Sequence, residues 1–437
     1  MGKKYLGIDV EDRFLKIVVM KDRRVLNTYL EIMPDNMVIG GRIAAFHALA
    51  DYLREVVRKN KIRVKDTAVV LPSETYYIRR VHLPKMTAAQ LQINLPYEFH
   101  DYLQEDTDQY VFDYSVLSVD EKEMELLIAA LSKQQVEEYK EMCKRAGLRL
   151  CKLVPDVLTI QEIVLPPEDP VARKKRLAEE EKSRNGEKKE ESRNAAREKK
   201  QRARDRKKNG LSVEELAQRA AAEAKAKGLQ TGSSIEAADM GTNAGNLTAG
   251  AAGQIPGGGT FPGAVSGGNT ASGGSGAGTE LQTGQKKDYA VLGMEYSRVR
   301  LHFFSGGAYE ITRNLGTTEK QICELIAQEK GVDVHIAQLM CDRNQDGVLE
   351  LEDVADLMQA LATEVMRVMN FYNYNNPRNT IDTIYYYGRE SNPLLLDRIQ
   401  SVTELPVRPL TELIPDADEG QQENLLMMLQ GYGAVLE

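Results

Sequence analysis

Two stretches that lie far apart in the chain share one layout, and this internal repeat constrains the fold more than any other feature. Residues 6–19 read LGIDVEDRFLKIVV, and residues 290–304 read AVLGMEYSRVRLHFF. Each consists of an apolar run, a short polar turn and a second apolar run, which is the pattern of two strands joined by a tight turn. The second stretch repeats the layout in a weaker form. Two such openings predict two α/β halves of similar design.

Apolar periodicity predicts the elements of each half. In the first half, strands are expected at 5–10, 14–20, 25–32, 67–72, 76–84, 109–117 and 124–131, and helices at 44–59, 85–103 and 133–147. In the second half, strands are expected within 288–315, 380–388 and 405–410, and helices at 318–331, 332–340, 352–376, 392–403 and 419–436. The ordered halves are therefore expected to span residues 1–166 and 288–437.

The segment between the halves, residues 167–287, has a different composition. Residues 173–208 hold 17 basic and 8 acidic side chains, a possible short helix covers 212–228, and residues 229–287 are rich in Gly, Ala, Ser and Thr. Such sequence buries too little apolar surface to offset the backbone entropy of folding. We expect a charged and then Gly-rich disordered linker. The basic tract is expected to be solvated rather than bound to a membrane or to nucleic acid.

Composition restricts the class of protein. The chain has 437 residues and a formal net charge of −8, and its apolar runs are too short to cross a bilayer. The first ten residues show no signal-peptide pattern, so a cytoplasmic location is expected. Its four cysteines and five histidines follow no metal-ligand spacing, so neither a His/Cys metal site nor a Cys/His nucleophile is expected.

Several segments together resemble the PilM family of type IV pilus assembly proteins, which are actin-like and related to the division protein FtsA. They are GIDVEDRFLKIVV, VHLPKMTAAQLQINLPYEFHDYLQED, FDYSVL, LLIAALSKQQVEEYKEMCKRAGL, LATEVMRVMNFYNYNNP and IDTIYYYG. The resemblance covers most of both halves and rests on the order and spacing of the segments. It implies an α/β, actin-like (ribonuclease H-like) fold, with a first lobe at 1–166 and a second lobe at 288–437. It also implies a small ferredoxin-like insert at about 76–150 and a C-terminal helix that returns to the first lobe.

The same resemblance implies a function in assembly rather than catalysis. A protein of this family would be a cytoplasmic scaffold of the pilus assembly complex. It would bind the cytoplasmic tail of a PilN-type inner-membrane protein, in a groove between subdomains, and so lie at the inner face of the cell membrane. The residues of that groove and the oligomeric state are left open. No nucleic-acid partner is expected.

Three loops depart from the family's nucleotide-binding pattern. Where the family has Gly two residues after the first Asp, this chain has Glu11, and where it has Asp-x-Gly in the second lobe, this chain has Gly293 and Glu295. The adenosine-side loop reads Gly388, Arg389, Glu390 instead of a Gly-rich turn. The residues expected at these degenerate loops are Asp9, Glu11, Lys16, Gly293, Glu295 and Gly388.

These departures predict that ATP and Mg²⁺ binding is lost. Glycine lets backbone N–H groups approach phosphate oxygens closely, whereas glutamate adds a Cβ and a like charge. Asp9 and Lys16 are retained, and we expect them to form a structural ion pair at the mouth of the cleft. The alternative is an ATP-binding, actin-like switch protein that uses Asp9 and Lys16.

Residues 342–353 match the calcium-binding loop of an EF-hand. The pattern supplies Gly347 for the sharp turn and Leu349 for the core. The candidate ligands are Asp342, Asn344, Asp346, Val348 (through its carbonyl), Glu350 and Asp353. Asp353 stands where the usual ligand is a bidentate Glu, a variant that resembles dockerin-type loops. The alternative is a polar turn that caps the next helix. A calcium-responsive interaction protein is therefore a third functional hypothesis.

Overall fold

A computed structural model describes residues 3–103, 106–165, 287–388, 393–414 and 422–436. These residues belong to one compact unit. The expected linker at 167–287 lies outside the described residues except for Lys287, and so does the helix expected at 212–228. Among the described residues, no helix combines the length and the apolar character needed to cross a bilayer.

The first sheet has five strands in the order β10-β6-β1-β2-β3. Its strands are β1 (Lys4–Val10), β2 (Phe14–Lys21), β3 (Arg24–Ile32), β6 (Asp66–Leu71) and β10 (Arg149–Pro155). The first three pair antiparallel, whereas β6 is parallel to both β1 and β10. Strands β1, β2 and β6 are buried almost throughout, which is why they read as continuous apolar runs rather than alternating ones.

The second sheet repeats this order as β13-β12-β11-β14-β15. Its strands are β11 (Tyr289–Glu295), β12 (Arg298–Ser305), β13 (Ala308–Leu315), β14 (Ile384–Gly388) and β15 (Val407–Pro409). Again the first three are antiparallel, and the last two are parallel to the opening strand and to each other. The repeated hairpin of the sequence therefore opens two sheets with one topology.

The insert in the first lobe has its own three-stranded sheet, in the order β7-β9-β8. It consists of β7 (Tyr76–Pro84), α2 (Ala88–Phe99), η1 (Thr107–Gln109), β8 (Tyr110–Val119) and β9 (Glu123–Ser132). Helix α2 begins with a capping box formed by Thr87 and Gln90 and packs on its own small core. The next helix, α3 (Lys133–Arg145), contacts α1 and β10 of the first lobe.

The remaining helices and short strands complete the two lobes. In the first lobe these are β4 (Val38–Ile39), β5 (Arg42–Ile43), α1 (Phe46–Lys59) and α4 (Asp156–Val164). In the second lobe they are α7 (Glu319–Lys330), α8 (Val334–Asp342), η2 (Gln345–Glu350), α9 (Glu352–Asn375), α10 (Pro393–Thr403) and η3 (Leu410–Leu413). Helix α9 packs on the second sheet, where Tyr372 stacks on Phe303 with ring centroids 3.9 Å apart.

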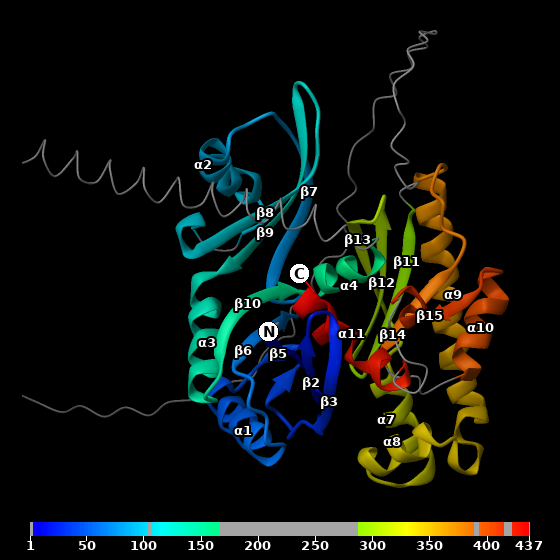
Figure 1. Cartoon of the computed structure of the whole chain (residues 1–437). Helices are drawn as coiled ribbons and strands as arrows, with labels where there is room; N and C mark the ends of the chain where they lie inside the picture. Colours follow the sequence, from blue (N-terminus) through cyan, green and yellow to red (C-terminus); the bar gives the residue numbers. More distant parts are fainter. Residues whose placement is uncertain (1–2, 104–105, 166–286, 389–392, 415–421, 437) are drawn as a thin grey trace, which may run out of the picture. The chain divides into compact units, whose positions relative to one another are not determined.

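The C-terminal helix α11 (Gln422–Leu436) contacts strands of both sheets (Figure 1). Glycines allow this close packing. A Cβ at Gly7 of β1 would lie 1.8 Å from the carbonyl oxygen of Gly431, and a Cβ at Gly433 would lie 2.1 Å from the carbonyl oxygen of Thr159. Because both neighbours are backbone atoms, no rotamer change could relieve the contact. The absence of a side chain at these glycines thus allows α11 to pack closely against β1 and α4.

Gly7→Ala should destabilise the protein by about 3 kcal/mol or more, because the methyl group would push α11 away from β1. The matched control is Gly316→Ala, whose Cβ would meet only ordinary van der Waals contacts. Chemical denaturation of both variants measures the difference. Equal free energies of unfolding for the two would contradict the close packing described here.

Candidate functional site

The first hairpin places Asp9, Glu11 and Lys16 together in the buried region where the two lobes meet, which is called the cleft below. Asp9 and Lys16 are directly opposed in the β1–β2 register. Lys16 Nζ donates a hydrogen bond to Glu11 Oε1 and lies 3.6 Å from Asp9 Oδ2. All three residues are at most 5% exposed. Two carboxyl groups therefore face one ammonium group in a buried setting.

This imbalance shifts the protonation of the acids. Burial, with the nearby Asp9 and Glu295 charges, raises the pKa of Glu11 to about 8 against the opposing effect of Lys16. Burial also raises the pKa of Asp9. Since one cation cannot neutralise two buried carboxylates, Glu11 holds a proton at neutral pH.

The second hairpin contributes a further acid and two arginines. Glu295 ends β11, and Arg298 and Arg300 follow on β12. Arg300 Nη2 donates to Glu295 Oε1 at 2.6 Å, and Arg298 forms an ion pair with the same carboxylate. Although burial opposes it, these two guanidinium groups lower the pKa of Glu295 to about 2. Glu295 is therefore an ionised partner of the arginines.

The two arginines also bind the first lobe. Arg300 Nη1 donates to Asp156 Oδ2 at 2.6 Å and to the Ser73 hydroxyl. Arg298 Nη1 donates to Glu74 at 2.6 Å. Arg300 is 1% exposed, so its guanidinium is buried between Asp156 of the first lobe and Glu295 of the second. This ionic network, defined as Asp9, Glu11, Lys16, Glu74, Asp156, Glu295, Arg298 and Arg300, fills the inner part of the cleft.

Gly293 and Gly388 lie beside this network and serve packing. A Cβ at Gly293 would lie 2.5 Å from the Tyr387 hydroxyl, and Gly388, with φ +109°, lies against the Met294 carbonyl. The Tyr387 hydroxyl accepts a hydrogen bond from Gln430 of α11 at 2.8 Å. An aromatic side chain and α11 thus occupy the space next to Glu295.

The sequence predicted Asp9, Glu11, Lys16 and Glu295 at this site. It did not predict Arg298 and Arg300. Arg298 and Arg300 are two residues apart in an otherwise apolar strand. Two cations on one face of a buried strand imply buried acids opposite, and this signal could have predicted them. Asp156 and Glu74 carry no such signal, because one begins helix α4 and the other lies in a turn.

The calcium hypothesis concerns a different part of the second lobe. Asn344, Asp346 and Gly347 all have positive φ, so the loop makes the sharp turn expected. The Asn344 amide donates to Glu350 Oε1 at 2.8 Å, and its carbonyl oxygen accepts from the Leu349 N–H. Asp342 ends α8, Val348 is buried and Asp353 lies in the first turn of α9. No group of three or more acidic, His or Cys side chains arranged for a metal ion is found in the described residues, and calcium binding stays a prediction.

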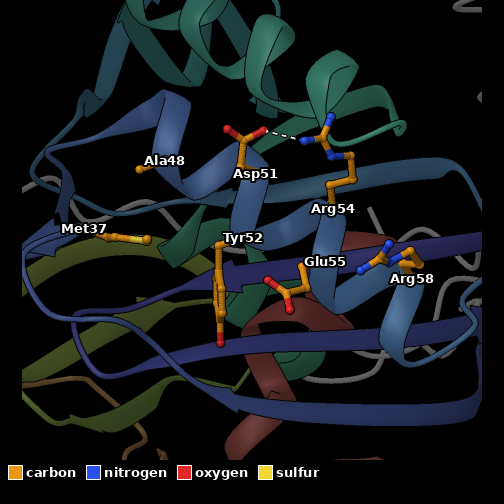
Figure 2. Close-up of a pocket in the computed structure, with 7 residues that line it drawn as sticks. All are labelled: Met37, Ala48, Asp51, Tyr52, Arg54, Glu55 and Arg58. Carbon is orange, nitrogen blue, oxygen red and sulfur yellow. Dashed lines mark hydrogen bonds and ion pairs between the residues drawn. The ribbon is translucent and has the colours of Figure 1, made fainter.

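A hollow on the surface of α1 is lined by polar side chains (Figure 2). Asp51 pairs there with Arg54 at 2.9 Å and with Arg145 of α3. The Tyr52 hydroxyl donates to the Ile32 carbonyl at 2.7 Å. The polar groups of Asp51 and Tyr52 already have ion-pair or hydrogen-bond partners. The hollow is therefore a weaker candidate site than the cleft or the groove described next.

An apolar groove runs between the small sheet and the first lobe, with a volume of about 300 Å³. One wall is β8 and β9, and the other is the ends of β6 and β10 with α3 and α4. Its lining residues are Leu71, Tyr76, Ile78, Val111, Phe112, Asp113, Tyr114, Ser115, Leu127, Ala129, Ala130, Leu131, Val136, Leu153, Pro155 and Leu158. Asp113 is the one charged residue among these. Five consecutive lining residues, 111–115, come from β8, an outer strand of its sheet.

Comparisons with known proteins agree with this architecture. Residues 7–160 match the model of the family described as type IV pilus assembly protein PilM. Over 99% of this chain and 97% of the other, the structure is similar to a chain of a PilM-PilN type IV pilus biogenesis complex, with a TM-score of 0.62 and 14% identity. It is also similar to the ethanolamine utilization protein EutJ from Carboxydothermus hydrogenoformans, with a TM-score of 0.44 and 9% identity over 100% of this chain and 90% of that one. No curated protein matches the chain.

Two sheets of one topology, each opened by an antiparallel hairpin, define an actin-like fold, as predicted. The predicted resemblance to the PilM family is also confirmed. The match to the PilM family model covers residues 7–160, which hold most of the first lobe.

The proton on Glu11 predicts an unusual dependence of stability on pH. Between about pH 4.5 and pH 8 the unfolded chain releases this proton while the folded protein keeps it, so the Glu11 contribution to stability is lost as pH rises through this window. Across this window the loss in the free energy of unfolding is on the order of 5 kcal/mol, and Glu11→Gln should abolish it. Glu295 acts in the opposite sense, and its contribution is lost as pH falls from about 4.5 to about 2.

Denaturation at a series of pH values measures this effect. The matched control is Glu123→Gln in the exposed β8–β9 turn, which should keep the wild-type slope. An identical slope in wild type and Glu11→Gln would contradict a proton on Glu11.

Proposed function

We propose that the chain is an actin-like scaffold of type IV pilus assembly that binds the cytoplasmic tail of a PilN-type inner-membrane protein. The tail occupies the apolar groove beside β8. Tail binding recruits the protein to the inner face of the cell membrane and links it to the pilus assembly complex. The mechanism is binding rather than turnover, and the cleft holds no nucleotide.

The observation that carries this proposal is the apolar groove between the small sheet and the first lobe. The PilM-PilN complex, whose fold this chain shares, is by its title an assembly of PilM with PilN. A groove lined mainly by aliphatic and aromatic side chains suits a short peptide that buries two or three apolar side chains. The groove lies within the insert and first lobe, and residues 7–160 are the part that matches the PilM family.

The edge of β8 suggests how the tail binds. The small sheet has the order β7-β9-β8, so the outer edge of β8 carries no paired strand among the described residues. An extended peptide can add to such an edge through main-chain hydrogen bonds, while alternate side chains enter the groove. Asp113 would attract a cationic group of the tail. We therefore expect an extended tail with apolar residues and a nearby positive charge.

The cleft supports a nucleotide-free mechanism. Its cations are already paired, since Arg298 and Arg300 bind Glu74, Asp156 and Glu295. In the β1–β2 turn, the Glu11 N–H donates to the Phe14 carbonyl at 2.9 Å and is not free for a phosphate. The residues present therefore do not fit Mg-ATP, in contrast to the alternative of an ATP-dependent switch.

Substitution of Val111 tests the groove. Val111 is 45% exposed on β8 and lines the groove, whereas Val119 is 46% exposed on the same strand and lies outside the groove lining. Val111→Lys should weaken binding of a PilN-type tail peptide at least about tenfold, because it places a charge in an apolar site. Val119→Lys is the matched control and should bind like wild type.

Calorimetric titration or fluorescence anisotropy with the tail peptide measures the affinities. Equal affinities for the two variants would place the tail elsewhere. Failure of the wild-type protein to bind any PilN-type tail would overturn the proposed function itself.

Titration with Mg-ATP tests whether the cleft binds nucleotide. We expect no heat of binding and no rise in melting temperature at millimolar Mg-ATP. A ligand at about one hundred times its dissociation constant stabilises a protein by about 2.7 kcal/mol, so micromolar binding would be evident. Binding that disappears in Asp9→Ala would instead favour the ATP-dependent switch.

A further inference from the structure

Positive side chains line one end of the first sheet. The register places Lys4 of β1 opposite Lys21 of β2, and Lys21 opposite Arg24 of β3. Strand β6 is parallel to β1 and to β10, so that β6 and β10 begin at this same end. The exposed or half-buried cations found there are called the cationic rim, and they are Lys3, Lys4, Lys21, Arg23, Arg24, Lys65 and Arg149.

Three members of the rim form a row across the sheet. Because Lys4, Lys21 and Arg24 are successive cross-strand partners, their side chains leave the same face, with Cβ atoms roughly 5 Å apart. Lys65, directly before β6, extends the row on the other side of β1. Like charges placed directly opposite one another destabilise a sheet. An external anion would relieve this repulsion.

The acids at this end leave most of the rim without a counter-charge. Asp66 is shared by Lys3, at 2.9 Å, and Arg149. Asp22 Oδ2 lies 4.0 Å from Lys21 Nζ. The other four members of the rim form no ion pair with any described residue. Seven cations thus face two acids, in a chain whose formal net charge is −8.

We propose that the cationic rim binds an anionic membrane surface, whose acidic lipid headgroups supply the missing counter-charge. Clusters of about four to eight Lys and Arg side chains are attracted to the negative surface of the cytoplasmic leaflet. The choice of a membrane rests on the proposed function, because the tail of an inner-membrane protein would bring the first lobe to the lipid.

The chemistry of the rim does not favour a nucleic acid. The strand ends that form it carry no exposed aromatic ring on which a base could stack. Tyr5, the aromatic residue of β1 at this end, is half-buried, and Lys3 Nζ lies 4.9 Å from its ring centroid. The rim offers charge alone, which is what a lipid surface requires.

The rim and the groove beside β8 lie at opposite ends of the same strands. Leu71 and Pro155 line the groove and are the last residues of β6 and β10, whereas the rim lies where these strands begin. The distance along β6 is roughly 17 Å, which about five extended residues of a tail can span. Both sites can therefore be engaged at once, and two linked sites bind more tightly than either alone.

Sedimentation of the full chain with lipid vesicles, in the absence of any tail peptide, tests the proposal. Wild type is expected to bind vesicles that contain phosphatidylglycerol but not vesicles of phosphatidylcholine alone, and added salt should release it. The rim variant Lys4→Glu/Arg23→Glu/Arg24→Glu should bind the anionic vesicles at least about tenfold more weakly. Wild-type protein that does not bind anionic vesicles would overturn the proposal.

The matched control is Lys330→Glu/Arg367→Glu/Arg378→Glu, which makes the same change in net charge at exposed positions of the second lobe. It should bind anionic vesicles like wild type. An equal loss of binding in both variants would show that net charge alone is responsible, and the rim would not be the site.

Two further measurements make the outcome unambiguous. Since Lys21 lies between Lys4 and Arg24, glutamates at those two positions form favourable cross-strand pairs, so the rim variant should be at least as stable as wild type in chemical denaturation. It should also bind the tail peptide like wild type. Loss of tail binding in wild type would overturn the proposed function, whereas loss of vesicle binding alone would overturn only the membrane site.

A DNA duplex serves as the competing polyanion. Wild-type protein that binds the duplex more tightly than anionic vesicles at the same salt concentration, and loses this binding in the rim variant, would identify a nucleic-acid site and overturn the proposal.

Discussion

The buried guanidinium of Arg300 is the interaction on which the cleft depends. It binds Asp156 from the first lobe and Glu295 from the second, with 2.6 Å between donor and acceptor in each case. Removing one partner from a buried ion pair costs about 3–5 kcal/mol, because the other charge is left without compensation. Each of the three residues therefore constrains the other two. The contact also joins β12 of one sheet to the start of α4 beside the other.

The surrounding residues follow from this pairing. Because Arg298 and Arg300 are paired with Glu295, Asp9 and Glu11 must share Lys16. The second carboxyl group is neutralised by a proton instead of a cation. Burial and the neighbouring acids raise the pKa of Glu11 to about 8. The acidic turn in LGIDVEDRFLKIVV is thus part of one charge balance that extends over both hairpins.

How much of this could be predicted depended on where the partners lie in the sequence. The repeated hairpins and their strands followed from local apolar patterns, and the actin-like fold followed from the resemblance to the PilM family; the structure and comparisons confirm them. Lys16 and Asp9 were predictable because they oppose each other across one turn. Asp156 was not, since its role depends on a guanidinium 144 positions away. The groove beside β8 was equally hidden, because its walls come from seven elements that only the tertiary fold brings together.

A cleft filled with protein charges changes what an actin-like fold can do. In a nucleotide switch, the ligand's charge holds the two lobes, and its loss releases them. Here the side chains of Asp156, Glu295, Arg298 and Arg300 supply both signs of charge where the two lobes meet. Under the proposed function a constant geometry would suit a scaffold, because the groove beside the first lobe would keep its shape for a tail peptide. Control of assembly would then come from the partner that binds beside β8, and not from a ligand between the lobes.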